Sequence, residues 1–271
     1  MPGASLRSVV EAVEDEIRRR GGELAFPAQT SVNEVAAHDC PSPEDDRTYE
    51  KGDLAKLDVG VHLDGYVVDT ALTVNVECGR EGATLVEATR AALEAAIAVA
   101  GPGVPIWRVS GAIATILRSF GVRPMRNLCG HHVGRWVVHC PPPVPNRPED
   151  AEGRLAVGAV LAIEPFATEG PGRVAERGEA QVFRQLSEPE EGGAAGDSGV
   201  LAALRARRGL PFSRRDLRGL PRGDLERHLK LLLQRGALAA YPPLLESTGR
   251  KVAQAEHTLY VGEDGVEVLT R

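Results

Sequence analysis

The sequence predicts an α+β fold in which a sheet-based domain is interrupted by a helical insertion. Residues 54–76 are typical of a β-hairpin because apolar residues flank the turn signal Asp64-Gly65. Further helical and strand-like stretches lie on both sides of this hairpin, and between Ser187 and Leu245 the pattern changes to helical segments. We therefore expect a main domain formed by residues 1–186 and 246–271, with a helical, winged-helix-like subdomain formed by residues 187–245.

The first expected element is an amphipathic helix from Ser5 to Arg20. Ser5 can cap its N-terminus, and Gly21-Gly22 would end it. Its apolar residues fall on one face at helical spacing: Val9, Val10, Val13 and Ile17. This spacing is typical of a helix that buries one side.

Strand geometry places two aspartates on the same face of the expected hairpin. Residues equally far from the turn face each other, so Gly60 lies opposite Asp69 if Asp64 and Gly65 form the turn. Asp58 is two residues from Gly60 and therefore on the same face as Gly60 and Asp69. Two carboxylates this close among apolar neighbours are costly unless a cation neutralises them.

The remaining elements follow from periodicity and from breaks. Two helices are expected at Thr84 to Ala100 and Ile106 to Phe120, separated by Gly101-Pro102-Gly103. Inside the insertion, helices are expected at Val200 to Arg208 and Asp224 to Gln234. Strand-like segments occupy these ranges: Arg135 to His139, Ala159 to Phe166, Arg173 to Phe183, His257 to Val261 and Val266 to Leu269.

Composition limits the possible classes of function. Hydrophobic residues make up 42% and charged residues 26% of the 271 residues, which is ordinary for a soluble globular protein. A formal net charge of -6 gives no whole-chain argument for binding DNA. The N-terminus lacks a signal-peptide pattern, and no apolar run approaches a membrane span. We expect a cytoplasmic protein with no membrane partner and with reduced thiols at the cysteines, which form no CxxC pair: Cys40, Cys78, Cys129 and Cys140.

Acidic residues and one histidine predict a metal site: Asp58, Asp69, His131, Glu164 and Glu256. Glu164 lies in an apolar strand-like segment and Glu256 directly before another, and a buried carboxylate there needs a partner such as a metal ion. His131 is one of three histidines within nine positions, beside glycines that permit close backbone approach. Hard oxygen donors with a single imidazole suit a pair of divalent first-row metal ions better than one structural zinc. If the five converge in space, the protein is a metal-dependent hydrolase.

Bland interpretations compete with each of these residues taken singly. A lone histidine is more often a structural hydrogen-bonding residue, and a pair of aspartates more often belongs to a turn or to the surface. The prediction therefore rests on the combination. Other catalytic schemes find less support, because the chain has no GxSxG elbow, no phosphate loop and no HExxH helix. A thiol nucleophile at Cys129 has nothing beyond the nearby His131 to favour it.

The insertion carries an excess of basic residues. An acidic, glycine-rich connector from Glu188 to Gly193 leads into it, and residues 201–236 contain ten basic residues against Asp216, Asp224 and Glu226. A solvated helical face is the simpler interpretation of this excess. A contact with RNA on the ribosome is the alternative.

The sequence resembles the methionine aminopeptidases, and specifically type 2 in its compact archaeal-like form. The similarity runs in order through nearly the whole chain. The long interval between Glu164 and Glu256, filled by the helical insertion, is a further point of resemblance to type 2. The matching stretches are Ala25-Phe26-Pro27, residues 31–38, Lys56 to Gly60, Val68-Asp69, Asn127 to Gly134, His139, Ala162 to Phe166, Tyr241 to Leu244 and Ala253 to Thr258.

The resemblance implies a pita-bread fold, a curved antiparallel sheet covered by helices in two pseudo-symmetric halves. It implies that Asp58 and Asp69 bind one metal ion, that Asp69 bridges to a second ion held by His131 and Glu164, and that Glu256 bridges both. The ions would be cobalt, manganese, iron(II) or zinc, about 3.5–4 Å apart, and would acidify a water aimed at the scissile carbonyl.

The resemblance also implies the roles of the remaining site residues. Glu164 would accept a proton, His139 would stabilise the tetrahedral intermediate and contact substrate, and His38 would orient the substrate. The methionine side chain would enter an apolar pocket lined by Phe26, Phe166 and Tyr241. The implied partner is the N-terminus of a nascent polypeptide, with possible ribosome contact, and the implied oligomeric state is a monomer.

A few positions depart from the family pattern. Ala255 stands where an aromatic residue is expected, Asp39 where a tyrosine often follows the histidine, and Cys140 with three prolines where small residues are usual. Members usually carry one more helix before the segment that matches Pro2 to Ile17, so the chain is expected to begin short. None of these departures removes a metal ligand.

Two alternatives to methionine removal follow from the same residues. An X-Pro dipeptidase or aminopeptidase P would use the same five ligands, although such proteins resemble chains with a long N-terminal domain. A non-enzymatic relative could keep the fold as a binding module for RNA or protein. Such relatives have lost metal ligands, whereas all five residues are present here.

Overall fold

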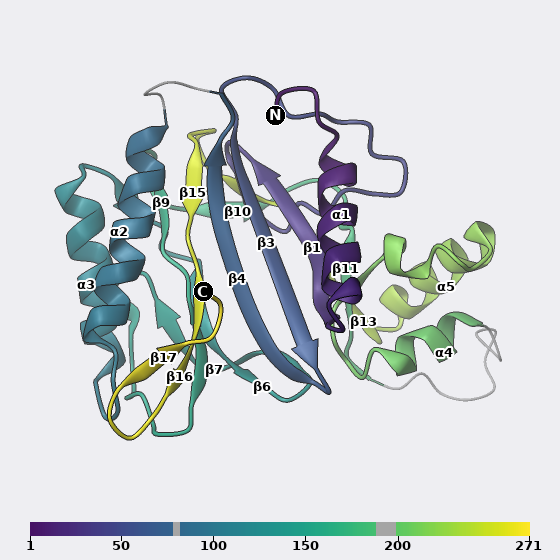
Figure 1. Ribbon diagram of the computed structural model, residues 1–271. Helices are drawn as coiled ribbons and strands as arrows, with labels where there is room; N and C mark the ends of the chain where they lie inside the picture. The colour runs from purple at the N-terminus through teal and green to yellow at the C-terminus, as the bar shows by residue number, and fades with distance from the viewer. Residues whose placement is uncertain (78–81, 188–198) are drawn as a thin grey trace.

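The computed structural model describes residues 1–77, 82–187 and 199–271, and the strands in these ranges pair antiparallel (Figure 1). The expected α+β class is confirmed. In the main body the sheets are, in spatial order, β1 (Glu23–Val32), β3 (Leu54–Leu63) and β4 (Tyr66–Asn75); β17 (Val266–Val268), β16 (His257–Val261), β8 (Val160–Ile163), β6 (Cys129–Gly134) and β7 (Val137–Pro145); β15 (Val252–Gln254), β9 (Phe166–Thr168) and β5 (Arg123–Pro124); and β10 (Val174–Glu176), β14 (Leu244–Glu246) and β2 (Val35–Ala37).

The β3–β4 hairpin has the predicted turn and register. Asp64 and Gly65 form the turn with left-handed φ angles of 49° and 84°, which twist the connection in the sense that two-residue hairpins favour. Gly60 pairs with Asp69, and Asp58 pairs with Ala71. Asp58 and Asp69 therefore lie on one face of the sheet, as the sequence predicted.

Two helices cover one side of the sheets. α2 (Ala83–Val99) and α3 (Ile106–Ser119) agree with the predicted helices within one residue at each end and lie together in Figure 1 beside β15 and β9. α2 presents the small residues Ala88, Ala92 and Ala96 to the core, which lets its backbone approach the strands closely. The buried side chains between these helices and the sheets form the largest apolar core of the described residues.

The N-terminal helix buries a different line of residues from the one expected. α1 (Leu6–Arg19) begins after Ser5, whose hydroxyl accepts a hydrogen bond from the Ser8 amide at 3.3 Å. Its buried residues are Leu6, Val10 and Glu14, whereas Val9, Val13 and Ile17 are only partly buried. The buried face is rotated because the Glu14 carboxylate has a charged partner inside the protein, a contact that apolar periodicity cannot reveal.

The insertion has a small core and sheet of its own. α4 (Gly199–Ala206), a 3₁₀ turn at Arg214–Leu217 and α5 (Arg222–Gln234) enclose buried residues that include Leu204 and Leu229. The accompanying sheet has the order β12 (Phe212–Ser213), β11 (Val182–Gln185) and β13 (Leu238–Tyr241). β11 thus pairs with strands of the insertion although it precedes residue 187, and β14 pairs with β10 and β2 of the main body. The division at residues 187 and 245 stays a prediction, and the connector Glu188 to Gly193 lies outside the described residues, as does Cys78.

Three of the expected strands are wrong as continuous elements. Residues 159–166 form β8 and β9 with Glu164-Pro165 between them, since proline has no amide to continue a ladder. Residues 173–183 divide into β10 and β11 around Gly178, which has a φ of 87°. Arg135 and Trp136 form the turn between β6 and β7 rather than the start of a strand. In the part of the chain that the structure describes, no helix is both long and apolar enough to cross a membrane.

Gly60 is required by a close approach between strands, and this contact can be tested. Phe26 on β1 pairs with Gly60, and a Cβ atom at Gly60 would overlap the Phe26 ring. Gly60→Ala should lower the free energy of unfolding by about 1–3 kcal/mol in urea titrations because the ring has to move. The matched control is Gly111→Ala in α3, where a Cβ has ordinary contacts and should add about 0.5–1 kcal/mol. Equal effects of the two changes would contradict this account of Gly60.

Candidate metal centre

The five predicted metal ligands come together from separate strands. Asp58 lies on β3, Asp69 on β4 and His131 on β6, while Glu164 follows β8 and Glu256 lies between β15 and β16. Nε2 of His131 is 3.6 Å from Oδ2 of Asp69 and 3.7 Å from Oε1 of Glu164. Ligand atoms of Asp69, His131 and Glu256 all lie within 4.8 Å of one another. The geometry is therefore that of one compact centre.

Buried hydroxyl groups hold β4 against the segment that carries Glu256. Oγ1 of Thr258 accepts a hydrogen bond from the Asp69 amide and donates one to the Asp69 carbonyl, both at 2.7 Å. Oγ1 of Thr70 donates to the Glu256 carbonyl at 2.9 Å. These side-chain bonds replace a regular strand ladder at this point, and they place the Asp69 and Glu256 carboxylates beside each other.

Burial opposes charge throughout the centre. Removal from water raises the pKa of Asp58 to about 7. Burial, and then the charges of neighbouring carboxylates, raise the pKa values of Asp69, Glu164 and Glu256 well above their usual range. Burial and then the charge of His139 lower the pKa of His131 to about 3, so its imidazole is neutral at physiological pH. A neutral imidazole is the form that binds metals.

Several oxygens of the centre lack any hydrogen-bond donor. Oδ1 of Asp58, Oδ1 of Asp69 and Oε1 of Glu256 are buried and have no partner within the described part of the chain. Buried acceptors are normally satisfied, so oxygens of three converging carboxylates call for a cation. The residues present fit divalent metal ions, and those that would hold them are Asp58, Asp69, His131, Glu164 and Glu256.

Gln254 belongs to the centre and received no role in the sequence analysis. Its Nε2 donates to Oε2 of Glu164 at 3.2 Å and to Oε2 of Glu256 at 3.4 Å. Its backbone is fixed by Thr73, whose Oγ1 donates to the Gln254 carbonyl at 2.7 Å. Gln254 orients the two carboxylates by contacting one oxygen of each. Its position two residues before Glu256 puts it on the same face of a strand, which is the signal that could have identified it.

The histidines predicted to contact substrate lie at the edge of the centre. The His139 ring on β7 lies 4.2 Å from the His131 ring in a T-shaped contact, and the His38 ring lies 5.7 Å from the Tyr241 ring. Burial lowers the pKa of His38, while a hydrogen bond to the Pro242 carbonyl acts in the opposite sense. Partial burial, followed by the charge of His38, lowers the pKa of His139 to about 4, although part of that residue is exposed. Both imidazoles favour the neutral form.

The predicted pocket residues lie in different apolar clusters. Phe26 packs with Val67 and Val138, whereas Phe166 packs with Met125 and Val174. Both rings are buried, and Tyr241 is partly buried beside His38. The structure thus does not bring Phe26 and Phe166 into one cluster. The largest hollow that stands out, of about 490 Å³, lies between α1 and the insertion rather than over the carboxylates.

Asp39, which departs from the family pattern, has a specific partner. Its carboxylate receives two hydrogen bonds from the Arg47 guanidinium, at 2.8 and 2.9 Å. The Asp39 carbonyl also accepts a bond from the Thr30 amide at 2.9 Å. Asp39 therefore fixes the backbone next to His38, which has a left-handed φ of 65°.

Comparisons with known proteins agree with this centre. The model of metallopeptidase family M24 matches residues 1–204. A methionine aminopeptidase of Thermococcus onnurineus is 42% identical over 272 residues, which cover 99% of this chain and 91% of that protein.

Solved structures show the same fold. The methionine aminopeptidase of Thermotoga maritima has a TM-score of 0.70 at 25% identity, with 100% of this chain and 87% of that chain covered. A thermophilic Arx1 has a TM-score of 0.85 at 15% identity, covering 99% and 84%, which shows the fold alone. The expected pita-bread fold is thereby confirmed. From the match to the family model and the 42% identity over almost the full length, the chain belongs to metallopeptidase family M24, among its methionine aminopeptidases.

Proposed function

We propose that the protein removes the N-terminal methionine from nascent chains whose second residue is small, by metal-dependent hydrolysis of the first peptide bond. The observation that carries this proposal is the convergence of Asp58, Asp69, His131, Glu164 and Glu256 in one buried, cation-deficient centre. The methionine aminopeptidases with which the chain belongs support the substrate class. Divalent metal ions bound there would supply Lewis-acid activation of the scissile carbonyl and of water.

The protein residues would divide the remaining tasks. Glu164, whose pKa is raised by burial and by the Asp58 charge, is suited to take a proton from the attacking water. His139, at the open side of the centre, would donate a hydrogen bond to the developing oxyanion. His38 would hold the substrate backbone, and Phe26, Phe166 and Tyr241 would bound the methionine pocket as separate walls. A tight adjoining subsite would exclude large second residues.

Finer assignments belong to the same proposal. The insertion between Glu164 and Glu256 supports the type 2 subtype. Two metal ions are proposed because five ligands, four of them carboxylates, exceed what one ion needs. We further propose a cytoplasmic monomer that meets its substrates at the ribosome.

Release of methionine from a Met-Ala-Ser peptide tests the proposed activity. Protein reconstituted with cobalt, manganese or iron(II) should release free methionine, and Asp69→Ala should lower the rate by at least about a thousandfold because a bridging ligand is lost. Free methionine measured by chromatography reports both results. Retained turnover in Asp69→Ala would sink the metal assignment.

Substrate choice separates the alternatives. An X-Pro dipeptidase would cleave Met-Pro or Ala-Pro and leave Met-Ala-Ser intact. A non-enzymatic module would bind no metal and cleave neither peptide. The expected result is cleavage of Met-Ala-Ser together with a metal-dependent rise in melting temperature.

Asp58 predicts a specific pH dependence of the metal-free protein. Its folded-state pKa of about 7 lies above the usual value of 3.8, so the folded protein keeps a proton that the unfolded chain loses. That contribution to stability is complete below about pH 4 and is lost as the pH rises to about 7. Asp58→Asn should therefore gain on the parent by roughly 1–4 kcal/mol across this window, with no further gain above it.

Urea unfolding of chelator-treated protein at several pH values measures this difference. Asp46→Asn, which changes an exposed aspartate, is the matched control and should show a flat difference. A gap between parent and Asp58→Asn that is constant with pH would contradict the raised pKa.

Ribosome contact would have to rely on few residues, because most basic residues of the insertion have internal partners. Arg214, Arg215, Arg218, Arg222 and Arg227 all form ion pairs. Lys230 and Arg235 are exposed on or beside α5 and form no ion pair within the described residues. Reversing both charges to Glu should remove most co-sedimentation with ribosomes at low salt, whereas Lys51→Glu with Arg123→Glu on the main body should not. Equal loss in both variants would indicate only non-specific attraction.

A further inference from the structure

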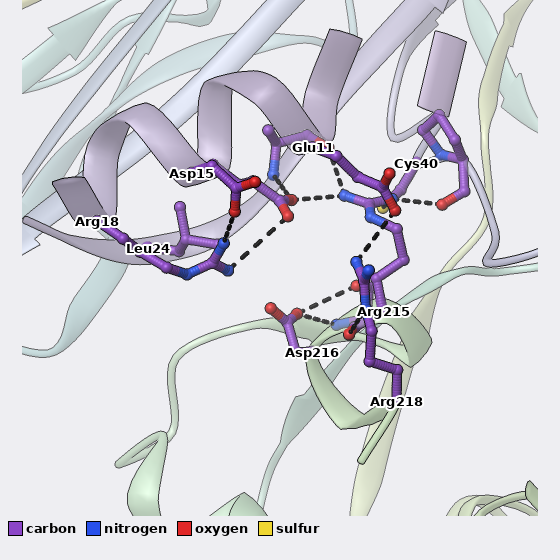
Figure 2. A network of polar contacts seen from close by, with 12 residues as sticks. Glu11, Asp15, Arg18, Leu24, Cys40, Arg215, Asp216 and Arg218 are labelled. Carbon is purple, nitrogen blue, oxygen red and sulfur yellow. Dashed lines mark hydrogen bonds and ion pairs between the residues drawn. The ribbon is translucent and has the colours of Figure 1, made fainter. Parts of the chain in front are cut away.

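A buried ion pair joins the insertion to the N-terminal helix. Nη2 of Arg215, in the 3₁₀ turn of the insertion, lies 2.5 Å from Oε1 of Glu14 on α1, and the two side chains are only 1% and 2% exposed (Figure 2). Replacing a buried ion pair by apolar residues is often neutral or stabilising. Stability alone therefore gives a weak account of this pair, and its other contacts indicate what it does.

Arg215 holds the segment that follows His38. Its Nη1 donates to Sγ of Cys40 at 3.1 Å and to the carbonyl of Pro41, and both residues are buried. His38 itself adopts a left-handed φ of 65°, a conformation that non-glycine residues keep only when their surroundings impose it. Arg47 fixes Asp39 from one side, and Arg215 fixes Cys40 and Pro41 from another.

The same pair holds the irregular stretch of β1 that follows Phe26. The Ala28 amide donates to Oε1 of Glu14 at 3.1 Å, and the Ala28 carbonyl accepts from Nη2 of Arg215 at 3.3 Å. The register of β1 against β3 shifts between Phe26 and Gln29, so the ion pair takes over bonds that a regular ladder would make. A bulge of this kind re-aims neighbouring side chains. Here the neighbouring side chain is Phe26.

We propose that Glu14 and Arg215 are a positioning pair through which the insertion holds two walls of the substrate pocket, His38 and Phe26. This inference rests on the proposed function, which assigns His38 and Phe26 to substrate binding. Neither Glu14 nor Arg215 contacts the metal-binding carboxylates. Loss of the pair should therefore weaken substrate binding and leave the metal centre intact.

A second ion pair crosses the same seam and provides a matched control. Nη2 of Arg218 lies 3.1 Å from Oε1 of Glu11 on α1, with side chains 56% and 31% exposed (Figure 2). Its other printed bond goes from Nε to the Arg215 carbonyl, within the same turn. Arg218 thus joins the same two elements without contacting β1 or residues 38–41. The hollow at this seam is lined by side chains of both signs, such as Glu11, Asp15, Arg18 and Arg218, and it suggests no ligand.

Steady-state kinetics of the metal-loaded full chain test the proposal. Arg215→Met should raise KM for Met-Ala-Ser by about tenfold with kcat changed by no more than about twofold, since binding geometry is lost while the metal centre remains. Arg218→Met should stay within about twofold of the parent in both constants. Metal affinity, measured by titration calorimetry, should be equal in all three proteins.

A double variant and a chemical probe separate positioning from folding. Glu14→Met with Arg215→Met removes both charges, and it should recover the melting temperature of the parent while keeping the raised KM. Iodoacetamide followed by mass spectrometry reports whether the segment after His38 has loosened. Cys40 should be protected in the parent and in Arg218→Met, and labelled in Arg215→Met and in the double variant.

Each outcome decides the matter. An unchanged KM in the double variant, or a Cys40 that stays protected in it, would overturn the proposal. A change in kcat and metal affinity with KM unaltered would also overturn it, because the pair would then support the centre instead of the pocket. A parent protein that releases no methionine would sink the proposed function, and Cys40 labelling would still decide whether the pair holds residues 38–41.

Discussion

The cost of burying carboxylates without a cation is the constraint on which this structure depends. Asp58, Asp69, Glu164 and Glu256 converge, and within the described residues none of them forms an ion pair with an arginine or a lysine. Charge of one sign in an apolar setting is tolerated only if protons or metal ions offset it. The hydroxyls of Thr70 and Thr258 and the amide of Gln254 hold the carboxylates together against this repulsion. The fold is thus prepared for an ion that it does not itself replace.

Local patterning predicted the parts of the fold that local forces determine. The turn at Asp64-Gly65 specified the hairpin register, and helical periodicity specified α2 and α3 within a residue. Prediction failed where a distant partner decides the outcome. Glu14 is buried because Arg215 meets it from the insertion, and β11 joins the insertion because β12 and β13 pair with it. Neither partner is close in sequence, so neither leaves a periodic signal.

The site could be predicted further than its surroundings. The two-residue period of strands placed Asp58 and Asp69 on one face, and family resemblance supplied the set of five. The pocket was less predictable, because Phe26 and Phe166 belong to separate apolar clusters whose separation depends on how the sheets stack. The basic residues of the insertion show the limit of counting charge. Most of them are engaged in ion pairs, and only the structure distinguishes those from free ones.

The threonine bonds that join β4 to the segment after β15 have a consequence for the order of assembly. They connect residues near position 70 with residues near position 256, in a chain that ends at Arg271. Contacts so distant in sequence close late, because loop-closure entropy has to be overcome before they form. During synthesis the hairpin with Asp58 and Asp69 emerges first and carries half of a metal site. It stays incomplete until almost the last residue has been added, so a truncated chain would hold the repelling carboxylates without the groups that complete the centre.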